Sequence, residues 1–283
     1  MPKLRRRRAP LITLSWTLSV LVLLPLALRA QASTALAEPK VTWEIGEGQG
    51  SWCVHLLVEP RAASDLAIRG QRTVAARDYA PLHPALRRVI TDEPQYAEWV
   101  PSQVCLWFTK GVSIGKRDYD RADGGKKPLA IFWWGLAATG DRLGAEPGLS
   151  QIVLATNNSG LKRQMELAFI QMERIEINRE PVPESDDEQF RLRLDRTDLF
   201  FSGHPRPDST MTVGPVVHHW AVRGDGNRVW QVEFSAYPTR VSALPGALRF
   251  QGKGKLAEAL AASPIRMVGT MLEGGTAWMK FIE

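Results

Sequence analysis

His218 and Glu233 are the pair of residues in this sequence whose types and spacing best suit catalysis. Both lie in the stretch VVHHWAVRGDGNRVWQVEFSA, residues 216–236. A carboxylate beside an imidazole orients the ring and raises its basicity, as a general base requires. The pair therefore predicts a hydrolase-type reaction that uses water or an unidentified nucleophile. The alternative is a polar cross-strand pair on a solvated sheet face, since no serine or cysteine nucleophile motif accompanies the two residues.

The two residues meet only if the stretch around them forms a β-hairpin. An Asp-Gly pair between two runs of β-branched and aromatic residues is a strong hairpin signal. With the turn centred on Asp225-Gly226, His218 lies opposite Glu233, and Trp220 lies opposite Gln231. A bulge of one residue would shift this register and exchange the two faces.

Tryptophan residues suggest a second kind of site, an apolar pocket for a ligand. The chain has ten of them, and Trp133-Trp134 stands directly before a glycine. Together with Trp220 and Gln231 on the mixed face of the hairpin, this pair is a candidate lining for such a pocket. Tryptophans scattered through strands also serve as core and rim residues, which is the alternative.

No residue pattern predicts a metal ion or a cofactor. Residues 118–125, DYDRADGG, have the look of a calcium loop, but the third acid comes one place late, and Leu129 stands where a bidentate glutamate is needed. We expect a solvated turn there, with a looser calcium site as the alternative. His218 and His219 are adjacent on a strand, so they cannot both ligate one ion without a bulge.

Cys53 and Cys105 are the only cysteines, and each lies in a strand-like run. In an oxidising compartment an even count of this kind predicts one disulfide. Neither cysteine has the spacing of a redox centre or an adjacent cation, which argues against a reactive thiol. His55 shares a strand face with Cys53 and is expected to be a packed histidine, while His83 precedes a proline and is expected in a loop.

Residues 1–37 predict an export signal. A basic head precedes an apolar run at 11–28, and two small-x-small cleavage sites follow at 30–32 and 35–37. We therefore expect a periplasmic or secreted protein; an uncleaved membrane anchor is the alternative. The segment holds six of the 36 basic residues and no acidic one, so the remainder has 30 of each sign. A mature chain without net charge does not favour nucleic-acid binding.

The remaining residues predict a β-dominated α+β fold, with a largely antiparallel sheet arranged as a sandwich or partial barrel and two or three short helices. The expected strands are 41–46, 51–58, 65–69, 103–109, 128–137, 151–156, 172–177, 190–195 and the two sides of the hairpin. Residues 265–272 and 276–282 predict a second hairpin, and helices are expected at 84–90, from a Ser159 cap to 169, and at 256–262.

An acidic, proline-containing stretch at 180–188 is the best candidate for a boundary between lobes. It would separate a β-rich lobe at 38–179 from a hairpin lobe at 189–283, although it would serve equally well as a surface loop within one domain.

These observations favour an exported, soluble, non-catalytic envelope protein that binds a small ligand or an envelope protein through its sheet. The alternatives are the hydrolase with His218 and Glu233, and a membrane-anchored assembly subunit that keeps residues 1–37.

Overall fold

A computed structural model describes most of the chain from Val41 onward. The described backbone covers 41–45, 51–114, 116–140, 144–167, 170–181, 188–194, 197–203, 209–213, 216–222, 229–234, 237–242, 248–252, 265–272 and 275–282. The predicted export signal and the predicted helix at 256–262 lie outside these residues. Residues 39–283 form one compact unit.

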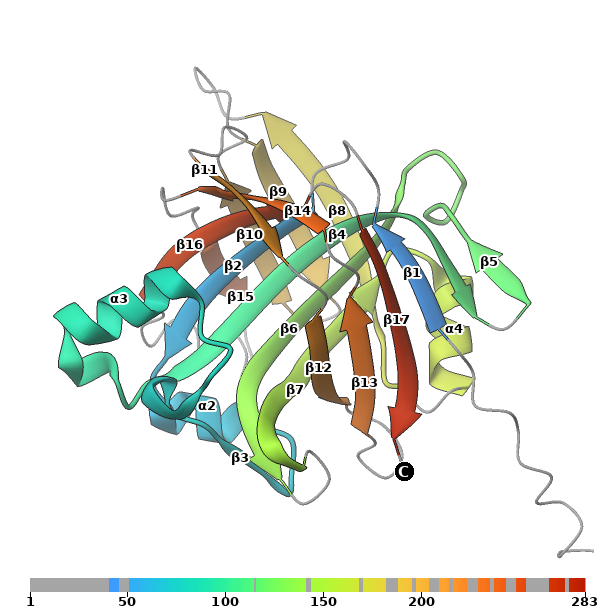
Figure 1. Cartoon of the computed structure of the whole chain (residues 1–283). Helices are drawn as coiled ribbons and strands as arrows, with labels where there is room; N and C mark the ends of the chain where they lie inside the picture. Colours follow the sequence, from blue (N-terminus) through green and yellow to red (C-terminus); the bar gives the residue numbers. More distant parts are fainter. Residues whose placement is uncertain are drawn as a thin grey trace, which may run out of the picture. The chain divides into compact units, whose positions relative to one another are not determined.

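Strands make up most of the described chain (Figure 1). They are β1 Val41–Ile45, β2 Ser51–Val58, β3 Gln71–Thr73, β4 Val100–Ile114, β5 Arg117–Tyr119, β6 Leu129–Gly140, β7 Gly144–Thr156, β8 Glu173–Pro181, β9 Glu188–Leu194, β10 Thr197–Gly203, β11 Ser209–Val213, β12 Val216–Val222, β13 Val229–Phe234, β14 Tyr237–Ser242, β15 Leu248–Gly252, β16 Ile265–Leu272 and β17 Gly275–Ile282. The prediction of a β-dominated fold with a few short helices is confirmed.

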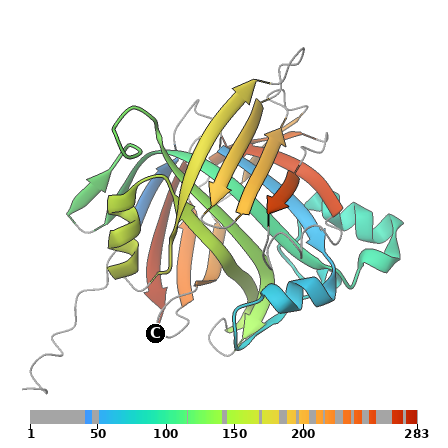
Figure 2. The ribbon, with the colours of Figure 1, turned by 180° about the vertical axis from the view of Figure 1, so that it is seen from behind.

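The strands form a strongly curled sheet, a half-barrel whose pairings return to their start (Figures 1 and 2). Strand β4 pairs with β6, β6 with β7, β7 with β12, β12 with β13, β13 with β17 and β17 with β1, which pairs back onto β4. The β7–β12 and β7–β8 pairings are parallel, whereas the other pairings of the described strands are antiparallel. The sheet is therefore mixed, although largely antiparallel as predicted.

Strand β6 is the centre of the core. Its residues from Leu129 to Ala138 are all buried, as the prediction of a central strand with two apolar faces requires. On one face of the neighbouring strands, Trp52 and Phe108 meet Phe190 of β9, with ring centroids 6.2 and 5.7 Å apart. The opposite face carries the disulfide and Trp133, because side chains alternate along each strand.

Three helices flank the sheet: α2 Pro60–Leu66, α3 Pro84–Asp92 and α4 Ser159–Leu167. Helix α2 replaces the strand predicted at 65–69. The Glu59 carboxylate caps it by accepting the Ala62 N–H, and Pro60 occupies the first turn, where the missing N–H costs nothing. Among the described residues, no helix has the length and apolar character needed to cross a membrane.

The other two helices confirm predictions, with one correction at a cap. Helix α3 covers the predicted 84–90 and contacts β2 and β16. Helix α4 begins at Ser159, but Asn158 supplies the cap, since its side-chain oxygen accepts the Leu161 N–H at 2.7 Å.

Strands β12 and β13 form the predicted hairpin with a register one residue away from the predicted one. The observed pairs include Val217 with Glu233, His218 with Val232, and Trp220 with Trp230. The numbers of the paired residues add up to 450, whereas the prediction requires 451, so the register differs by one residue. The predicted opposition of His218 to Glu233 is therefore wrong.

The prediction that residues 265–272 and 276–282 form a hairpin is wrong, although both strands exist. Strand β16 pairs with β2 and β14, whereas β17 pairs with β1 and β13. Strands β8 and β9 instead form a hairpin, in which the pairing extends as far as Pro181 with Glu188. The acidic stretch at 180–188 therefore joins two adjacent strands.

Candidate functional site

The predicted catalytic pair is not assembled by the hairpin. His218 pairs with Val232, and Glu233 pairs with Val217 on one side and with Trp278 of β17 on the other. Of the predicted ligand-binding residues on the hairpin, Gln231 lies between His219 and Lys280 in the pairing. The register thus brings neither predicted pair into direct opposition.

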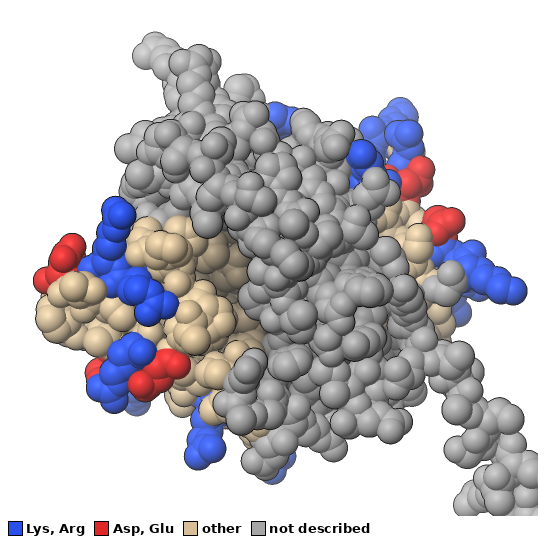
Figure 3. Space-filling model, viewed as in Figure 1, with Lys and Arg blue, Asp and Glu red and all other residues tan. Residues whose placement is uncertain are grey.

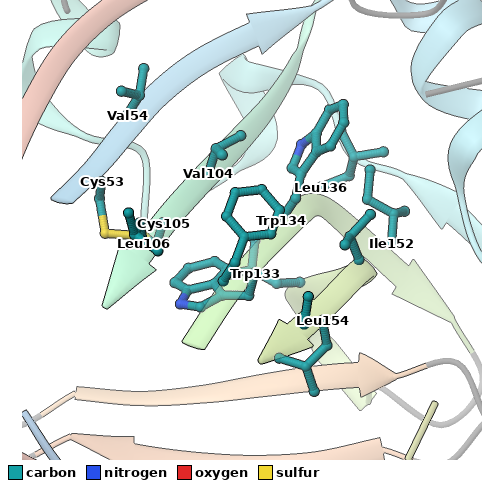
Figure 4. Packing of buried hydrophobic residues seen from close by; sticks show 14 of the residues in the cluster. Cys53, Val54, Val104, Cys105, Leu106, Trp133, Trp134, Leu136, Ile152 and Leu154 are labelled. Carbon is teal, nitrogen blue, oxygen red and sulfur yellow. A yellow bond between two sulfur atoms is a disulfide. The ribbon is translucent and has the colours of Figure 1, made fainter. Parts of the chain in front are cut away.

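The predicted pocket tryptophans on β6 are core residues. Trp133 and Trp134 are 1 % and 0 % exposed, and their side chains leave β6 in different directions (Figure 4). Trp134 donates its indole N–H to the Ser102 hydroxyl at 2.6 Å. Trp133 stands edge to face with Trp107 at 5.4 Å between ring centroids. Both side chains pack in the core, and Trp133 is on the same face as the disulfide.

The Cys53–Cys105 disulfide is present as predicted. The cysteines are directly opposed on β2 and β4, with Cα atoms 4.1 Å apart. This short separation is typical of an antiparallel pair without mutual backbone hydrogen bonds, where side chains approach closely enough to bond. Both cysteines are buried (Figure 4).

In the predicted solvated turn at 118–125, the Asp123 carboxylate makes structural contacts. Asp123 accepts hydrogen bonds from the backbone N–H and hydroxyl of Ser159, at 2.9 and 3.1 Å, and forms an ion pair with Arg174 at 2.5 Å. These contacts occupy the carboxylate that a calcium ion would need. Among the described residues, no group of three or more acidic, histidine or cysteine side chains is arranged to hold a metal ion.

One row of polar residues crosses the apolar sheet. His55 of β2 is opposite Gln103 of β4, Gln103 is opposite Gly135 of β6, and Gly135 is opposite Gln151 of β7. Residues in register on adjacent strands point to the same face, so the three side chains share it. At the usual strand spacing the row spans about 14 Å. We call these four residues the polar row.

Apolar residues border the polar row on both sides. The disulfide and Trp133 occupy the next positions on one side, and Leu57, Ala137 and Leu149 occupy them on the other. A line of polar groups in such surroundings is unusual, because a polar group removed from water costs free energy unless it is hydrogen-bonded.

The β2 end of the polar row is a half-buried cluster of His55, Gln103 and His83. The two imidazole rings lie against each other with centroids 4.6 Å apart and planes inclined by 37°. The Gln103 amide nitrogen lies 3.5 Å from His55 Nε2. Because an amide nitrogen can only donate, the imidazole nitrogen is the acceptor of this long, weak bond.

His83 is fixed at the start of α3. It is the N-cap residue, and its Nδ1 accepts the Ala85 N–H at 3.2 Å, while Pro84 occupies the first helical position. With Nδ1 as acceptor, the proton of the neutral ring is on Nε2. Burial lowers the pKa of His83 below its ordinary value of 6.5, so the ring beside His55 is uncharged at neutral pH.

The β7 end of the polar row is closed. Gln151 is 2 % exposed, and neither its amide nitrogen nor its amide oxygen has a hydrogen-bond partner. The amide lies over Gly135, where an added Cβ would be 3.1 Å from Nε2. Since these atoms are covered, the accessible part of the row is its His55 and Gln103 end.

Other reactive groups are scarce in the part of the chain that the structure describes. Ser102 is buried and donates its hydroxyl to the Gly135 carbonyl at 2.9 Å, and both thiols are in the disulfide. The lysines with described side chains are exposed or, for Lys162, half-buried and paired with Glu166. These residues therefore offer no desolvated amine and no activated nucleophile beside the polar row.

The sequence alone did not predict this cluster. His55 was expected to be a packed histidine and His83 a loop residue, whereas the fold places the two rings against each other. Strand alternation places Gln103 on the same face as Cys105, and the predicted disulfide places His55 beside Gln103. The proximity of His55 and Gln103 could therefore have been predicted from the sequence. The contact of His83 with His55 could not, because it depends on how α3 packs against β2.

No protein-family model matches the sequence, and no curated protein matches it either. The solved structures that share its broad arrangement include the enduracididine biosynthesis enzyme MppR complexed with pyruvate, at 14 % identity, covering 90 % of this chain and 94 % of that chain with a TM-score of 0.49. Another is the acetoacetate decarboxylase from Legionella pneumophila, at 8 % identity, covering 87 % of each chain with a TM-score of 0.49. A third is an acetoacetate decarboxylase-like enzyme from Sphingomonas wittichii RW1, at 10 % identity, covering 87 % of this chain and 94 % of that chain with a TM-score of 0.46.

The predicted non-catalytic envelope binding protein has no counterpart among these matches, whose names are those of enzymes or enzyme-like proteins. Their low identities and TM-scores transfer no substrate and no site residue to this chain.

Proposed function

We propose that the mature chain is an exported enzyme that moves protons to and from small carbonyl compounds, with His55 as the acid–base group. The observation that carries the proposal is the half-buried cluster of His55, His83 and Gln103 at the open end of the polar row. Histidine is the commonest general acid or base, because the ordinary pKa of imidazole is near neutrality.

Gln103 supplies the binding partner for a carbonyl oxygen. A primary amide carries two N–H donors, and only one of them is directed at His55 Nε2. The bond to His55 is 3.5 Å long, so a substrate can replace it at small cost. Bonds of this kind are often long before the substrate binds and shorten in the reacting complex.

His83 acts as a positioning residue. Its ring is held by the Ala85 N–H and lies flat enough against His55 to restrict how that ring turns. Because burial keeps His83 uncharged, it places no positive charge beside His55.

The shortage of other reactive groups favours proton transfer over covalent catalysis. The hydroxyl of Ser102, next to Gln103 in the chain, donates to the Gly135 carbonyl, and both cysteine sulfurs are in the disulfide. A base with a carbonyl-binding amide is sufficient to take a proton from the carbon next to a carbonyl group.

Export is part of the proposal because of the disulfide. Cysteine pairs of this kind persist in oxidising compartments and are rare in reducing ones. The bonded Cys53 and Cys105 therefore support the periplasmic or secreted location predicted from residues 1–37.

The test is deuterium exchange at carbon, followed by proton NMR. The mature protein is incubated in deuterium oxide with a panel of small ketones, 2-oxo acids and 3-oxo acids, and the loss of the signal next to the carbonyl is timed. We expect exchange of at least one compound, and we expect His55→Gln to slow it by about 100-fold or more.

His83→Asn is the matched variant, since asparagine also caps helices and removes only the imidazole. We expect it to keep part of the exchange activity and to shift its pH profile. A wild-type protein that exchanges no compound, or a His55→Gln variant that exchanges at the wild-type rate, contradicts the proposal.

A further inference from the structure

A hollow of about 690 Å³ opens beside β5 and α4 and shares no residue with the polar row. Its lining consists of Arg117, Asp118, Tyr119, Gly160, Arg163, Gln164 and Leu167. The volume is within the range of small-molecule sites, about 300 to 1,000 Å³. The residues from α4 are spaced at i, i+3, i+4 and i+7, so they form one face of the helix, opposite the buried Leu161 and Met165.

Among the described residues, the lining of the hollow holds two guanidinium groups and one carboxylate. Arg117 and Arg163 are exposed, and Arg117 donates to the neutral Gln164 amide at 3.2 Å. Asp118 is the acidic residue of the lining, and its carboxylate accepts the Ser113 hydroxyl at 2.5 Å. Where β5 lies in Figure 1, Figure 3 shows Lys and Arg side chains together with a few acidic ones.

The same hollow exposes apolar surface. Leu167 is 64 % exposed. No other large hydrophobic side chain that the structure describes is exposed. The half-buried Tyr119 ring lies against Gly160, where an added Cβ would be 3.3 Å from a ring carbon. Glycine at this position leaves the ring without a covering side chain from α4.

We propose that this hollow binds an amphiphilic monoanion, a carboxylate that carries an aryl or acyl group. Guanidinium groups bind carboxylates through paired, charge-assisted hydrogen bonds, and this assigns the charged end to Arg117 and Arg163. The apolar group lies against Tyr119 and Leu167, where it removes their exposed surface from water. The proposal does not depend on the reaction proposed for His55.

Binding of 2-naphthoate to the mature protein, measured by isothermal titration calorimetry, tests the site. We expect Arg117→Gln/Arg163→Gln to weaken binding at least about tenfold, because the carboxylate loses both cationic partners. Leu167→Gln is expected to weaken binding of 2-naphthoate but not the much weaker binding of acetate, which has no ring to bury.

Arg88→Gln is the control, because Arg88 is an exposed cation on α3, away from the hollow. It removes one charge from the protein and is expected to leave binding unchanged. The neutral 2-naphthamide is expected to bind at least about tenfold more weakly than 2-naphthoate. No measurable binding of 2-naphthoate, equal loss in Arg88→Gln, or binding that survives the double substitution overturns the proposal.

Discussion

A buried amide without a hydrogen-bond partner is costly, and Gln151 has two such atoms. Leaving a buried donor or acceptor unpaired costs about 1 to 3 kcal/mol, whereas an apolar side chain of similar shape has no such cost. At the scale of single residues, the polar row therefore combines an accessible end at His55 with a closed end that lowers stability.

Replacing Gln151 with methionine is expected to raise the free energy of unfolding by about 1 kcal/mol, because methionine is as long and unbranched but has no polar amide. Urea unfolding of the two proteins measures the difference. Gln103→Met is the matched control and is expected to show no such gain, since Gln103 contacts His55. A loss of stability in Gln151→Met would mean that the amide is satisfied in solution, for example by a water molecule.

His83 is expected to make stability depend on pH. Its folded pKa is below the ordinary value of 6.5, so the unfolded chain binds the proton more readily. The contribution of His83 to stability is present above pH 6.5 and is lost as the pH falls through 6.5 toward the folded pKa. Urea unfolding between about pH 7.5 and about pH 5 should show a smaller loss in His83→Asn than in the wild type. Equal losses in the two proteins would rule out this contribution.

At the scale of elements, a cap and an ion pair hold the start of helix α4 in place. Asn158 caps α4 by accepting the Leu161 N–H, and its amide also donates to the Arg121 carbonyl at 2.7 Å. Asp123 then joins the start of the helix to Arg174 on β8. These contacts attach α4, which forms one wall of the hollow, to the loop after β5.

Asn158→Ala is expected to lower the free energy of unfolding by about 1 to 2 kcal/mol, because the helix loses its capping acceptor. Asn158→Asp keeps an acceptor and should lose less, although it can no longer donate to Arg121. Thermal and urea unfolding of the three proteins provide the comparison. If Asn158→Asp is as destabilised as Asn158→Ala, the cap is not the source of the stability.

At the scale of the whole sheet, the described strands are curled, and a disulfide cross-links β2 to β4. The disulfide joins residues separated by 52 positions, and in the chain-entropy model a loop of this length contributes up to about 4 kcal/mol. The sheet brings distant segments together, since β1 pairs with β17 and β2 pairs with β16. Folding therefore depends on long-range pairing, which the disulfide restricts in the unfolded chain.

Cys53→Ala/Cys105→Ala is expected to lose up to about 4 kcal/mol of stability relative to the oxidised protein. Reduced wild-type protein, unfolded in the presence of a thiol, is the matched comparison and should behave similarly. If oxidised and reduced proteins unfold at the same denaturant concentration, the cross-link does not stabilise the fold.

The mass of the protein recovered from the exported fraction tests location and cross-link together. We expect a chain that begins after residue 32 or residue 37 and is two hydrogen atoms lighter than its reduced form. An intact Met1 would contradict cleavage, and a chain at its reduced mass would contradict the disulfide in the native protein.

Local patterns in the sequence were enough to predict the strand-rich fold, the buried β6 and the helix at 84–90, because period-two alternation and apolar runs act over short distances. The Cys53–Cys105 bond could be predicted because the chain has only two cysteines. Tertiary structure decided the rest. The register of β12 with β13 placed His218 opposite Val232 instead of Glu233, and β16 and β17 found partners other than each other. The stacking of His83 on His55 and the hollow at α4 depend on how helices pack against strands, a property that residue spacing along the chain does not contain.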